Sequence, residues 1–575
     1  MSLRPLANVV AVASPDPAEL RAARERIEGS GEFDPPWSLA PGRLAAVARL
    51  PGTTPDGEPV RASGLVFAQG RDEVAASGRA WDEVARLVAE RPESVGELPG
   101  DFGLLCFGPS GETTVVRSAG GLVPFYVAGA GERWTVSTTL AHMLRFHWEE
   151  LELDPLINAI WTTGYDAAPD RRTFVSGVRV LGRGEYVRLG GPRPEFGRWW
   201  HPRRGATPRA APDHAERLRS ALVGTLEREL DPGGENLLAL SGGVDSSAVG
   251  ALAAGLLGRD VSTLTVLPED EAARARDLRY IDALTEAVGF RRRRMVTLDR
   301  ERRLAILDEP RVPYHVLHPY LCLLPSVVSE WPVSVLVGGD FADHTVGSTL
   351  TLRDWARHTS ALGLWRARRV LPTGPADVRR WFVYRLRRAL RRPPLPWPAE
   401  LPALVRPQLR AEYREWFRDR RREGARDDGP MPYLAMFLER QGFLGMQWEL
   451  TSSLGVRRSF PFVTRELLEL AFECHPSELV GPGTKRLLRA ALAGDVPAFN
   501  LERPDKGRPG PGRDSGPRVW SGDIPAILES VLAPDWPPER EIAYWDVFRG
   551  RQLVAFAKAF ERSRAGRSAL QRENR

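Results

Sequence analysis

A glycine-containing loop, Ser241-Gly242-Gly243-Val244-Asp245-Ser246-Ser247, stands between a predicted strand and a predicted helix. The short apolar run at residues 236–240 predicts the strand, and the alanine- and leucine-rich segment at residues 246–257 predicts the helix. A direct passage from strand to helix is typical of sheets whose strands run parallel and bind ligands at their carboxyl ends. The loop therefore restricts this part of the chain to an α/β architecture.

The alternation of strands and helices continues after the loop. The further predicted elements are strands at residues 261–267, 294–298 and 333–337 and a helix at residues 277–288. The last strand ends in Gly338-Gly339-Asp340, and from about residue 350 to residue 447 the pattern is helical and rich in Arg and Trp. We expect a domain over residues 214–575 that is built on a parallel sheet and carries this large helical portion.

The first two hundred residues follow a different rhythm. Short or alternating apolar runs are separated by Gly, Pro and Asp clusters, which is typical of antiparallel sheets. The predicted strands lie at residues 8–13, 44–50, 64–68, 103–107, 113–117, 125–128 and 134–138, and helical patterns lie at residues 17–28, 72–90 and 140–147. A connector rich in Pro, Gly and Arg follows at residues 191–212. We therefore predict a first, β-rich domain over residues 1–200.

The composition is that of a soluble globular protein with two or more domains, since 42% of the 575 residues are hydrophobic and 27% are charged. No run approaches about eighteen uninterrupted apolar residues, so no membrane span is expected. The start of the chain lacks a signal-peptide pattern, and Cys106, Cys322 and Cys474 match no metal spacing or disulfide framework. A cytoplasmic protein is expected. Acidic residues are interleaved with the many arginines behind the net charge of +6, which favours solvated helix faces over a nucleic-acid surface.

The residue types of the loop suit a phosphate-binding site. Its two glycines let the backbone approach an anion closely, and the following helix presents free N–H groups and a partial positive charge. The three serine hydroxyls can add hydrogen bonds to phosphate oxygens. Asp245 would repel phosphate unless a cation lies between them, so it is a predicted Mg²⁺ ligand. No Gly-Lys-Ser/Thr follows the glycines, so the loop suits pyrophosphate as the leaving group when ATP is cleaved at the α-phosphorus.

These residues resemble the loop of the PP-loop ATP pyrophosphatases, and the rest of the chain resembles one branch of them, the asparagine-synthetase-like amide synthetases. The second motif of that family appears here, in altered form, as Gly338-Gly339-Asp340-Phe341-Ala342-Asp343. The resemblance implies that Asp343 and Asp245 share Mg²⁺ and the pyrophosphate, with ATP as the nucleotide. Phe341 stands where the family usually has a small residue, and His344 follows the aspartate. The competing interpretation is an Asx turn at the end of a strand.

Three segments nearer the C-terminus extend the resemblance. Pro461-Phe462-Val463-Thr464 resembles the family's Pro-Phe-Leu-Asp turn, and Gly483-Thr484-Lys485-Arg486-Leu487-Leu488-Arg489 resembles the helix opening that follows it. Arg503-Pro504-Asp505-Lys506-Gly507 resembles the segment whose lysine faces the α-phosphate, so Lys506 is expected to stabilise charge on the phosphates. The predicted catalytic residues are Lys506, Asp340 and Arg489. The predicted nucleotide-binding residues are Ser241, Gly242, Gly243, Val244, Asp245, Ser246, Ser247, Leu264, Val266 and Gly339.

Two segments of the first domain, Leu98-Pro99-Gly100-Asp101-Phe102-Gly103 and residues 117–126, resemble the glutamine-amidotransferase sandwich at the front of asparagine synthetases. The resemblance implies αββα layers and a cysteine nucleophile exposed directly after the initiator methionine. Position 2 here is Ser2, and Cys106 lies well inside a predicted strand. We therefore expect a degenerate amidotransferase-like domain that generates no ammonia and supports the synthetase domain.

Without ammonia, the substrate itself has to supply the amine. The resemblance then implies a β-lactam synthetase, a carbapenam synthetase or a lasso-peptide macrocyclase. The chain length, the helical segment and Asp340 in place of the β-lactam synthetases' catalytic tyrosine favour a macrocyclase. Such an enzyme adenylates an Asp or Glu side chain of a precursor peptide and joins it to the peptide's own N-terminal amine. Asp340, His315 and His318 are candidate bases. A leader-peptide-binding protein and a leader peptidase are the implied partners.

Other functions stay open at this stage. One is a synthetase that acts on a small β-amino acid, or on aspartate with free ammonia. Another is a tRNA-modifying PP-loop enzyme that uses the arginine-rich helices on phosphate backbone, although such enzymes usually lack the N-terminal sandwich. A third is a degenerate scaffold, which is suggested by Thr464 and the altered surroundings of Asp343, whereas the intact first loop favours an enzyme.

Overall fold

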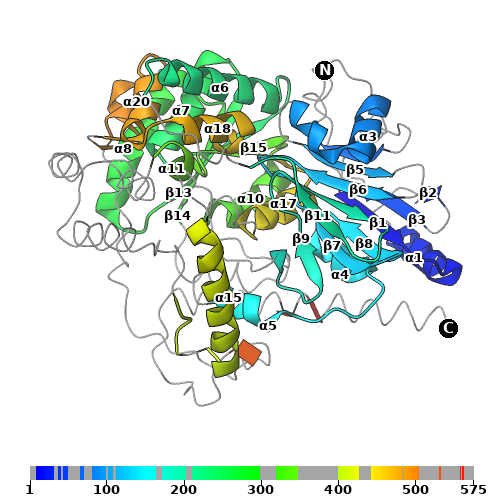
Figure 1. Ribbon diagram of the computed structural model, residues 1–575. Coiled ribbons are helices and arrows are strands. Elements are labelled where there is room, and N and C mark those ends of the chain that lie inside the picture. Colours follow the sequence, from blue (N-terminus) through cyan, green and yellow to red (C-terminus); the bar gives the residue numbers. More distant parts are fainter. Residues whose placement is uncertain are drawn as a thin grey trace.

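The structure is a computed structural model of the chain. It describes residues 8–30, 37–40, 43–48, 65–69, 81–98, 102–107, 112–162, 171–201, 210–297, 319–347, 399–403, 405–426, 442–481, 483–503, 530–531, 557–558 and 560–561. Two antiparallel sheets from the first part of the chain lie beside a parallel sheet from the second part (Figure 1). The predicted mixed α/β fold with a parallel sheet is confirmed.

The two antiparallel sheets contain the strands of the first two hundred residues. The six-stranded sheet has the order β2 (Trp37–Ala40), β3 (Arg43–Ala48), β1 (Asn8–Ala13), β8 (Arg133–Ser137), β7 (Tyr126–Ala130), β9 (Val178–Val180). The five-stranded sheet has the order β11 (Glu195–Arg198), β10 (Glu185–Leu189), β6 (Thr113–Arg117), β5 (Gly103–Phe107), β4 (Leu65–Gln69). Strand β1 is paired on both sides, which explains why every residue of its apolar run is buried.

Apolar side chains pack the two sheets against each other and pack helices against their outer sides. The facing sides meet in one core, to which Val9 and Trp134 contribute from one sheet and Leu105 and Val187 from the other. Helices α1 (Pro17–Gly29) and α4 (Leu140–Phe146) cover the outer side of the six-stranded sheet, and α3 (Trp81–Glu90) covers that of the five-stranded sheet. Helix, sheet, sheet and helix therefore follow one another, which is an αββα sandwich.

The parallel sheet has the order β14 (Arg292–Thr297), β13 (Val261–Leu267), β12 (Asn236–Ala239), β15 (Val335–Gly338), β16 (Arg457–Ser459). Every neighbouring pair in it is parallel. Along the chain, the strands after β12 are first added on one side of it, as β13 and β14, and then on its other side, as β15 and β16. A reversal of this kind leaves a crevice between the loops that follow the two central strands, where open α/β sheets bind their ligands.

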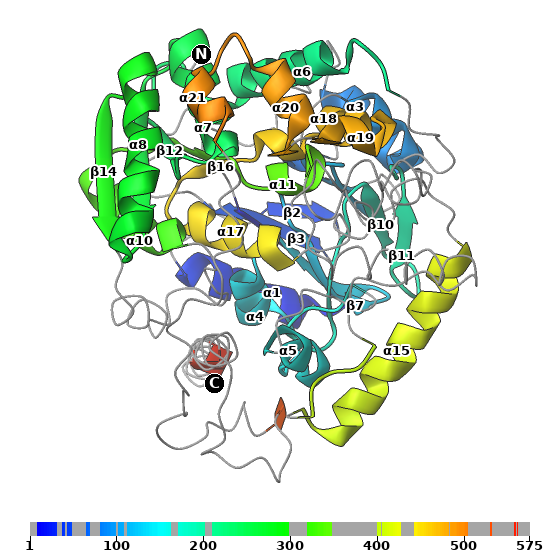
Figure 2. The same cartoon turned by 90° about the vertical axis from the view of Figure 1, so that its left-hand side faces the viewer.

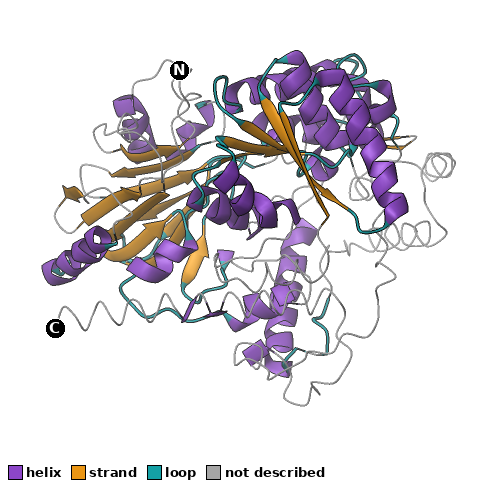
Figure 3. Ribbon diagram, turned by 180° about the vertical axis from the view of Figure 1, so that it is seen from behind, coloured by secondary structure: helices purple, strands orange, loops and turns teal. Residues whose placement is uncertain are grey.

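Helices cover both faces of the parallel sheet (Figure 3). One face carries α6 (His214–Glu229), α7 (Val244–Gly250), α18 (Arg465–Glu473) and α20 (Arg486–Ala491), whose apolar residues share a core with Leu238 and Val337. The other face carries α10 (Pro319–Glu330) and α17 (Gly442–Ser453), which share a core with Leu237 and Leu336. Adjacent residues of β12 and of β15 thus serve opposite faces, as the two-residue period of a strand requires.

Helix α17 also joins the parallel-sheet part to the sandwich. The Trp448 indole N–H donates to Asn8 Oδ1 at 3.0 Å, and Glu449 Oε1 accepts from the backbone N–H of Leu140 at the start of α4. A second contact is made by α15 (Pro407–Arg426), which packs against α5 (Pro155–Thr162) and is the long helix at the edge of Figure 2. The two parts of the chain are therefore tied together by buried side chains.

Most of the predicted helical portion at residues 350–447 lies outside the described residues, apart from α15 and the start of α17. Within the described part of the chain, no helix is both long enough and apolar enough to cross a membrane.

Candidate active site

The glycine-containing loop and the second acidic turn begin side by side. Ala239 of β12 is paired with Gly338 of β15, so the segments that follow these two residues leave the same edge of the sheet. Gly339 lies directly against the loop: a Cβ on it would come within 2.6 Å of Asp245 Cβ and 2.7 Å of the Ser246 backbone nitrogen. The two motifs that the sequence singled out are therefore in contact, as a shared ligand would require.

Hydrogen bonds within the loop set its shape. Ser246 Oγ lies 3.2 Å from both the backbone nitrogen and the hydroxyl oxygen of Ser241, and the Gly243 N–H donates to Ser241 Oγ at 3.3 Å. Gly242 has a φ of +65°, a conformation that a side chain would disfavour. Val244 follows at the start of α7 and is buried in the core, which fixes the helix beneath the loop.

Lys485 lies between the two predicted metal ligands. Its Nζ is 2.5 Å from Asp245 Oδ2 and 2.8 Å from Asp343 Oδ1, so both carboxylates point at one position. Burial alone would lower the pKa of the Lys485 ammonium, but the negative charges of the two aspartates outweigh it and raise this pKa above its usual value. The lysine is therefore held as a cation between the two carboxylates.

The backbone is strained at Lys485 and close to Asp343. In the described part of the chain three non-glycine residues have positive φ angles, and two of them are Phe341 at +70° and Lys485 at +61°. Phe341 lies two residues before Asp343, and its ring meets that of Phe460 edge-on with centroids 5.1 Å apart. Strain of this type persists where the surroundings impose it, which is common at functional sites.

An arginine that sequence reasoning did not single out clamps the loop. Arg503 donates from Nη1 to the Gly242 carbonyl at 2.6 Å and from Nη2 to Asp277 Oδ1 at 2.5 Å. Its guanidinium carbon lies 4.5 Å from the centre of the Tyr280 ring, in helix α8 (Glu271–Val288). Because Arg503 is 2% exposed, these contacts are made largely out of water. The loop is thereby fastened to α8.

Asp340 belongs to a second polar cluster at the end of β15. The Tyr320 hydroxyl donates to Asp340 Oδ2 at 2.8 Å, and Arg458 Nη2 donates to the same oxygen and lies 3.1 Å from the Tyr320 hydroxyl. Burial raises the pKa of the Tyr320 phenol well above its usual value, so Tyr320 remains a hydrogen-bond donor. The side chain predicted as a base is thus an ion-paired carboxylate.

The other predicted site residues have different surroundings. Arg489 donates to the Arg503 carbonyl at 3.0 Å, so it supports the clamp. Leu264 and Val266 lie in β13, where Leu264 is buried and both residues pack in the core beneath α10. Ser247 is buried in α7, and Asn500 Nδ2 donates to its hydroxyl at 3.4 Å. Lys506, His315 and His318 lie outside the described residues.

Thr464 stands where the resembling family has aspartate, and it caps a helix. Its side-chain oxygen accepts from the Leu467 N–H at 3.4 Å at the start of α18. Threonine and aspartate are both favourable N-cap residues because each offers an oxygen to an unpaired N–H. The difference in residue type therefore leaves the local structure intact.

The residues of this site fit Mg²⁺ and ATP, the ion and the nucleotide that the sequence implies. Asp245 and Asp343 offer hard oxygen ligands that converge on one cationic centre, which suits Mg²⁺. Glycine backbone beside a helix start, with Lys485 nearby, suits the phosphates of a nucleotide. The arrangement can therefore hold a nucleotide and neutralise charge on its phosphates.

Comparison with known proteins gives one family match. Residues 217–555 match the family model described as asparagine synthase. No curated protein matches the chain. The allosteric regulatory enzyme of purine biosynthesis matches with 12% identity and a TM-score of 0.21, over 51% of this chain and 75% of that chain. The glutamine phosphoribosylpyrophosphate amidotransferase from B. subtilis, complexed with ADP and GMP, matches with 10% identity and a TM-score of 0.20, over 58% and 74%.

Proposed function

Because the chain belongs to the asparagine synthase family, an ATP-dependent family that forms carbon–nitrogen bonds, we propose that it is a macrolactam synthetase. In the proposed reaction, the side-chain carboxylate of an Asp or Glu in a peptide attacks the α-phosphorus of ATP and releases pyrophosphate. The peptide's own α-amine then attacks the activated carbonyl carbon, an isopeptide bond forms, AMP leaves and the amine loses a proton. One peptide and one ATP give one cyclic peptide, AMP and pyrophosphate.

The observation that carries the proposal is the convergence of Asp245, Asp343 and Lys485 beside the glycine loop. A leaving pyrophosphate accumulates negative charge, and the positive charges of Lys485 and of a divalent cation at this cluster are suited to receive it. When bound, Mg²⁺ would add positive charge at the two aspartates. Arg503 and Gly339 keep the loop in place, and Lys506 is proposed to face the α-phosphate.

The αββα sandwich is the basis for inferring that the substrate itself supplies the amine. No cysteine precedes Cys106 in these 575 residues, and Cys106 is buried in β5 beneath α3. Burial raises the pKa of its thiol, which makes it a poor nucleophile. We therefore propose that the αββα sandwich is a degenerate glutamine-amidotransferase-like domain and that no ammonia is made there.

Asp340 is proposed to act on the amine. Its carboxylate is held by Arg458 and Tyr320 at the end of β15, next to the residue that contacts the loop. A fixed carboxylate attracts an incoming ammonium group and can direct its proton away from the acyl carbon. A peptide that carries both reacting groups needs no second encounter, an advantage that can reach roughly 7–11 kcal/mol.

The experiment is incubation of the protein with ATP, Mg²⁺ and synthetic core peptides that have a free N-terminus and one internal Asp or Glu. AMP, pyrophosphate and a peptide that has lost one water are the expected products. Production of ADP, or of AMP without any change in peptide mass, would overturn the proposal. A leader-binding protein and a leader peptidase, the proposed partners, are added in a second series with the full-length precursor.

Two variants divide the reaction into its halves. Asp245→Asn is expected to abolish peptide-dependent exchange of pyrophosphate into ATP. Asp340→Asn is expected to retain this exchange and to lose ring closure, because the Asp340 carboxylate is bonded to Tyr320 and Arg458 in the second polar cluster. If Asp340→Asn closes rings at the wild-type rate, the role given to Asp340 is wrong, whereas the macrolactam product itself would still be established by its mass.

A second candidate function is a synthetase for small substrates, with which the asparagine synthase match is equally consistent. It predicts pyrophosphate exchange with aspartate or a β-amino acid and none with peptides. The same assay therefore distinguishes the two functions.

A further inference from the structure

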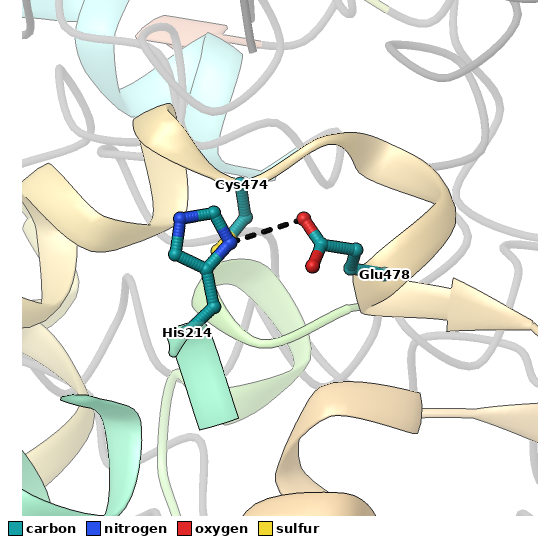
Figure 4. A group of neighbouring side chains, drawn as sticks. All are labelled: His214, Cys474 and Glu478. Carbon is teal, nitrogen blue, oxygen red and sulfur yellow. Dashed lines mark hydrogen bonds and ion pairs between the residues drawn. The ribbon is translucent and has the colours of Figure 1, made fainter. Parts of the chain in front are cut away.

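A cluster of three ligand-type side chains lies outside the candidate active site. His214, Cys474 and Glu478 each offer one donor atom, and the three atoms lie within 4.8 Å of one another (Figure 4). His214 Nδ1 is 3.1 Å from Glu478 Oε2. His214 begins α6, Cys474 directly follows α18, and Glu478 lies in α19 (Pro476–Leu479).

Backbone N–H groups fix the orientation of the cluster. Glu478 Oε1 accepts from the Ala211 N–H at 3.3 Å, and Glu478 Oε2 accepts from the His475 N–H at 3.1 Å. These donors come from the segment before α6 and from the turn after α18. The carboxylate is thus held from both sides, so little rearrangement is needed before it can bind a ligand.

Burial and charge both suit a cation. Cys474 is fully buried and His214 is 4% exposed, so a bound ion would be shielded from bulk water. Four charged side chains lie close enough to interact electrostatically with the Cys474 sulfur. They are the carboxylates of Glu478, Glu473 and Asp213 and the guanidinium of Arg217. Arg217 pairs with Glu473 at 2.7 Å, which leaves an excess of negative charge around the cluster. A divalent cation would compensate that excess.

We propose that His214, Cys474 and Glu478 bind one divalent transition-metal ion of the zinc class. A thiolate, an imidazole nitrogen and a carboxylate oxygen are the donor types that Zn²⁺ takes, with bond lengths of about 2.0–2.3 Å. Tetrahedral donors at such lengths are about 3.5 Å apart, so no donor pair within 4.8 Å has to approach by more than about 1.3 Å. The ion displaces the thiol proton, which passes to solvent, and water completes the coordination.

The ion would support the active site without touching substrate. The chain passes from Glu478 through the short strands β17 (Val480–Gly481) and β18 (Gly483–Thr484) to Lys485. The backbone of Leu479 also packs on Gly347, just beyond the turn that carries Asp343. Fixing α19 to the start of α6 therefore fixes the beginning of the segment that leads to Lys485 and the contact of Leu479 with Gly347.

The test uses the full chain without an affinity tag. The protein is treated with a chelator, dialysed and titrated with Zn²⁺, and the bound metal is counted by elemental analysis. One Zn²⁺ per chain is expected, together with a rise in melting temperature. Titration with Co²⁺ is expected to produce a thiolate-to-cobalt charge-transfer band. Absence of this band in the wild-type protein would overturn the proposal without recourse to any variant.

Variants assign the ligands. Cys474→Ser and Glu478→Gln are expected to weaken Zn²⁺ binding by roughly a hundredfold or more, because each removes a ligand outright. Cys106→Ser, which removes a buried thiol in the sandwich, is the matched control and is expected to keep the cobalt band. Asp245→Asn combined with Asp343→Asn is expected to keep it as well, which separates this site from the magnesium site. A band that survives Cys474→Ser, or that is lost in either control, would contradict the assignment.

Discussion

The ammonium group of Lys485 lies 2.5 Å from Asp245 Oδ2. This contact joins the glycine-containing loop to a residue that lies 240 positions later in the chain. Asp343 contacts the same nitrogen at 2.8 Å. In the absence of a metal ion, the lysine therefore neutralises the carboxylates that would otherwise repel each other. A divalent cation that bound both aspartates would compete with Lys485 for their oxygens.

Lys485→Met is predicted to make stability depend on Mg²⁺. Without metal, the variant should lose roughly 1–3 kcal/mol, because two facing carboxylates lose their common partner. Added Mg²⁺ should raise the melting temperature of the variant more than that of the wild-type protein, since no lysine competes for the site. Thermal melts with and without Mg²⁺ measure this, and Asp245→Asn in the same background should abolish the response. Equal responses in variant and wild type would contradict the competition.

Arg503→Lys is predicted to raise the KM for ATP by about tenfold or more. Lysine keeps the charge but cannot bond Gly242 and Asp277 at once, and one lost hydrogen bond of about 1.4 kcal/mol corresponds to a factor of ten. Pyrophosphate exchange at varied ATP concentration measures the effect. Arg219→Lys is the matched control, because Arg219 makes a bidentate pair with Asp495 elsewhere in the same domain. A similar rise in both variants would assign the effect to general stability instead.

The first loop could be predicted because its strand, glycines and helix are neighbours in the sequence. The αββα layers, which the resemblance implied, also follow from local patterns, since Val9 and Val10 lie in a continuous apolar run and serve opposite sides of one strand. Strand β14 was located to within two residues. Its position at the edge of the sheet could not be predicted, because strand order depends on pairing between distant segments.

The rest of the candidate site depends on contacts between distant residues. Arg503 bonds Gly242 across 261 positions and Arg458 bonds Asp340 across 118. Arg458 does not stand out in a chain with 80 Lys and Arg residues, and the resemblance of the segment that begins at Arg503 directs attention to Lys506 instead. The positive φ of Lys485 is another such feature, since nothing in its neighbours along the chain demands it. The sequence signal that could have identified Lys485 is its place in the segment that resembles the helix opening of the family.

Glu449→Gln is predicted to stabilise the protein at alkaline pH. Burial, opposed by hydrogen bonds from the N–H groups of Leu140 and Ala141, raises the pKa of the Glu449 carboxyl from 4.5 to about 8. Between these two values the unfolded chain loses this proton and the folded protein keeps it, so the carboxyl's contribution to stability falls as pH rises.

The variant should come close to the wild type near pH 5 and exceed it by on the order of 3–4 kcal/mol at pH 8, because its amide does not ionise. Denaturant unfolding at both values measures the difference. Glu466→Gln, which changes an exposed residue of α18, should show no such trend. A stability gain for Glu449→Gln that is independent of pH would show that the carboxyl does not titrate in this range.

Gly339→Ala is predicted to abolish most of the ATP-dependent activity while the protein still folds. The new methyl group would lie 2.6 Å from Asp245 Cβ and 2.7 Å from the Ser246 nitrogen, so the loop or the turn must move. Overpacking of this kind costs about 1–3 kcal/mol, and a displacement of about 1 Å at a reacting centre can reduce the rate about a hundredfold. Gly233→Ala is the control, because a Cβ there meets nothing within 4 Å. Exchange rates and melting temperatures of both variants test this: wild-type exchange in Gly339→Ala would mean that the two motifs need not touch for the enzyme to use ATP.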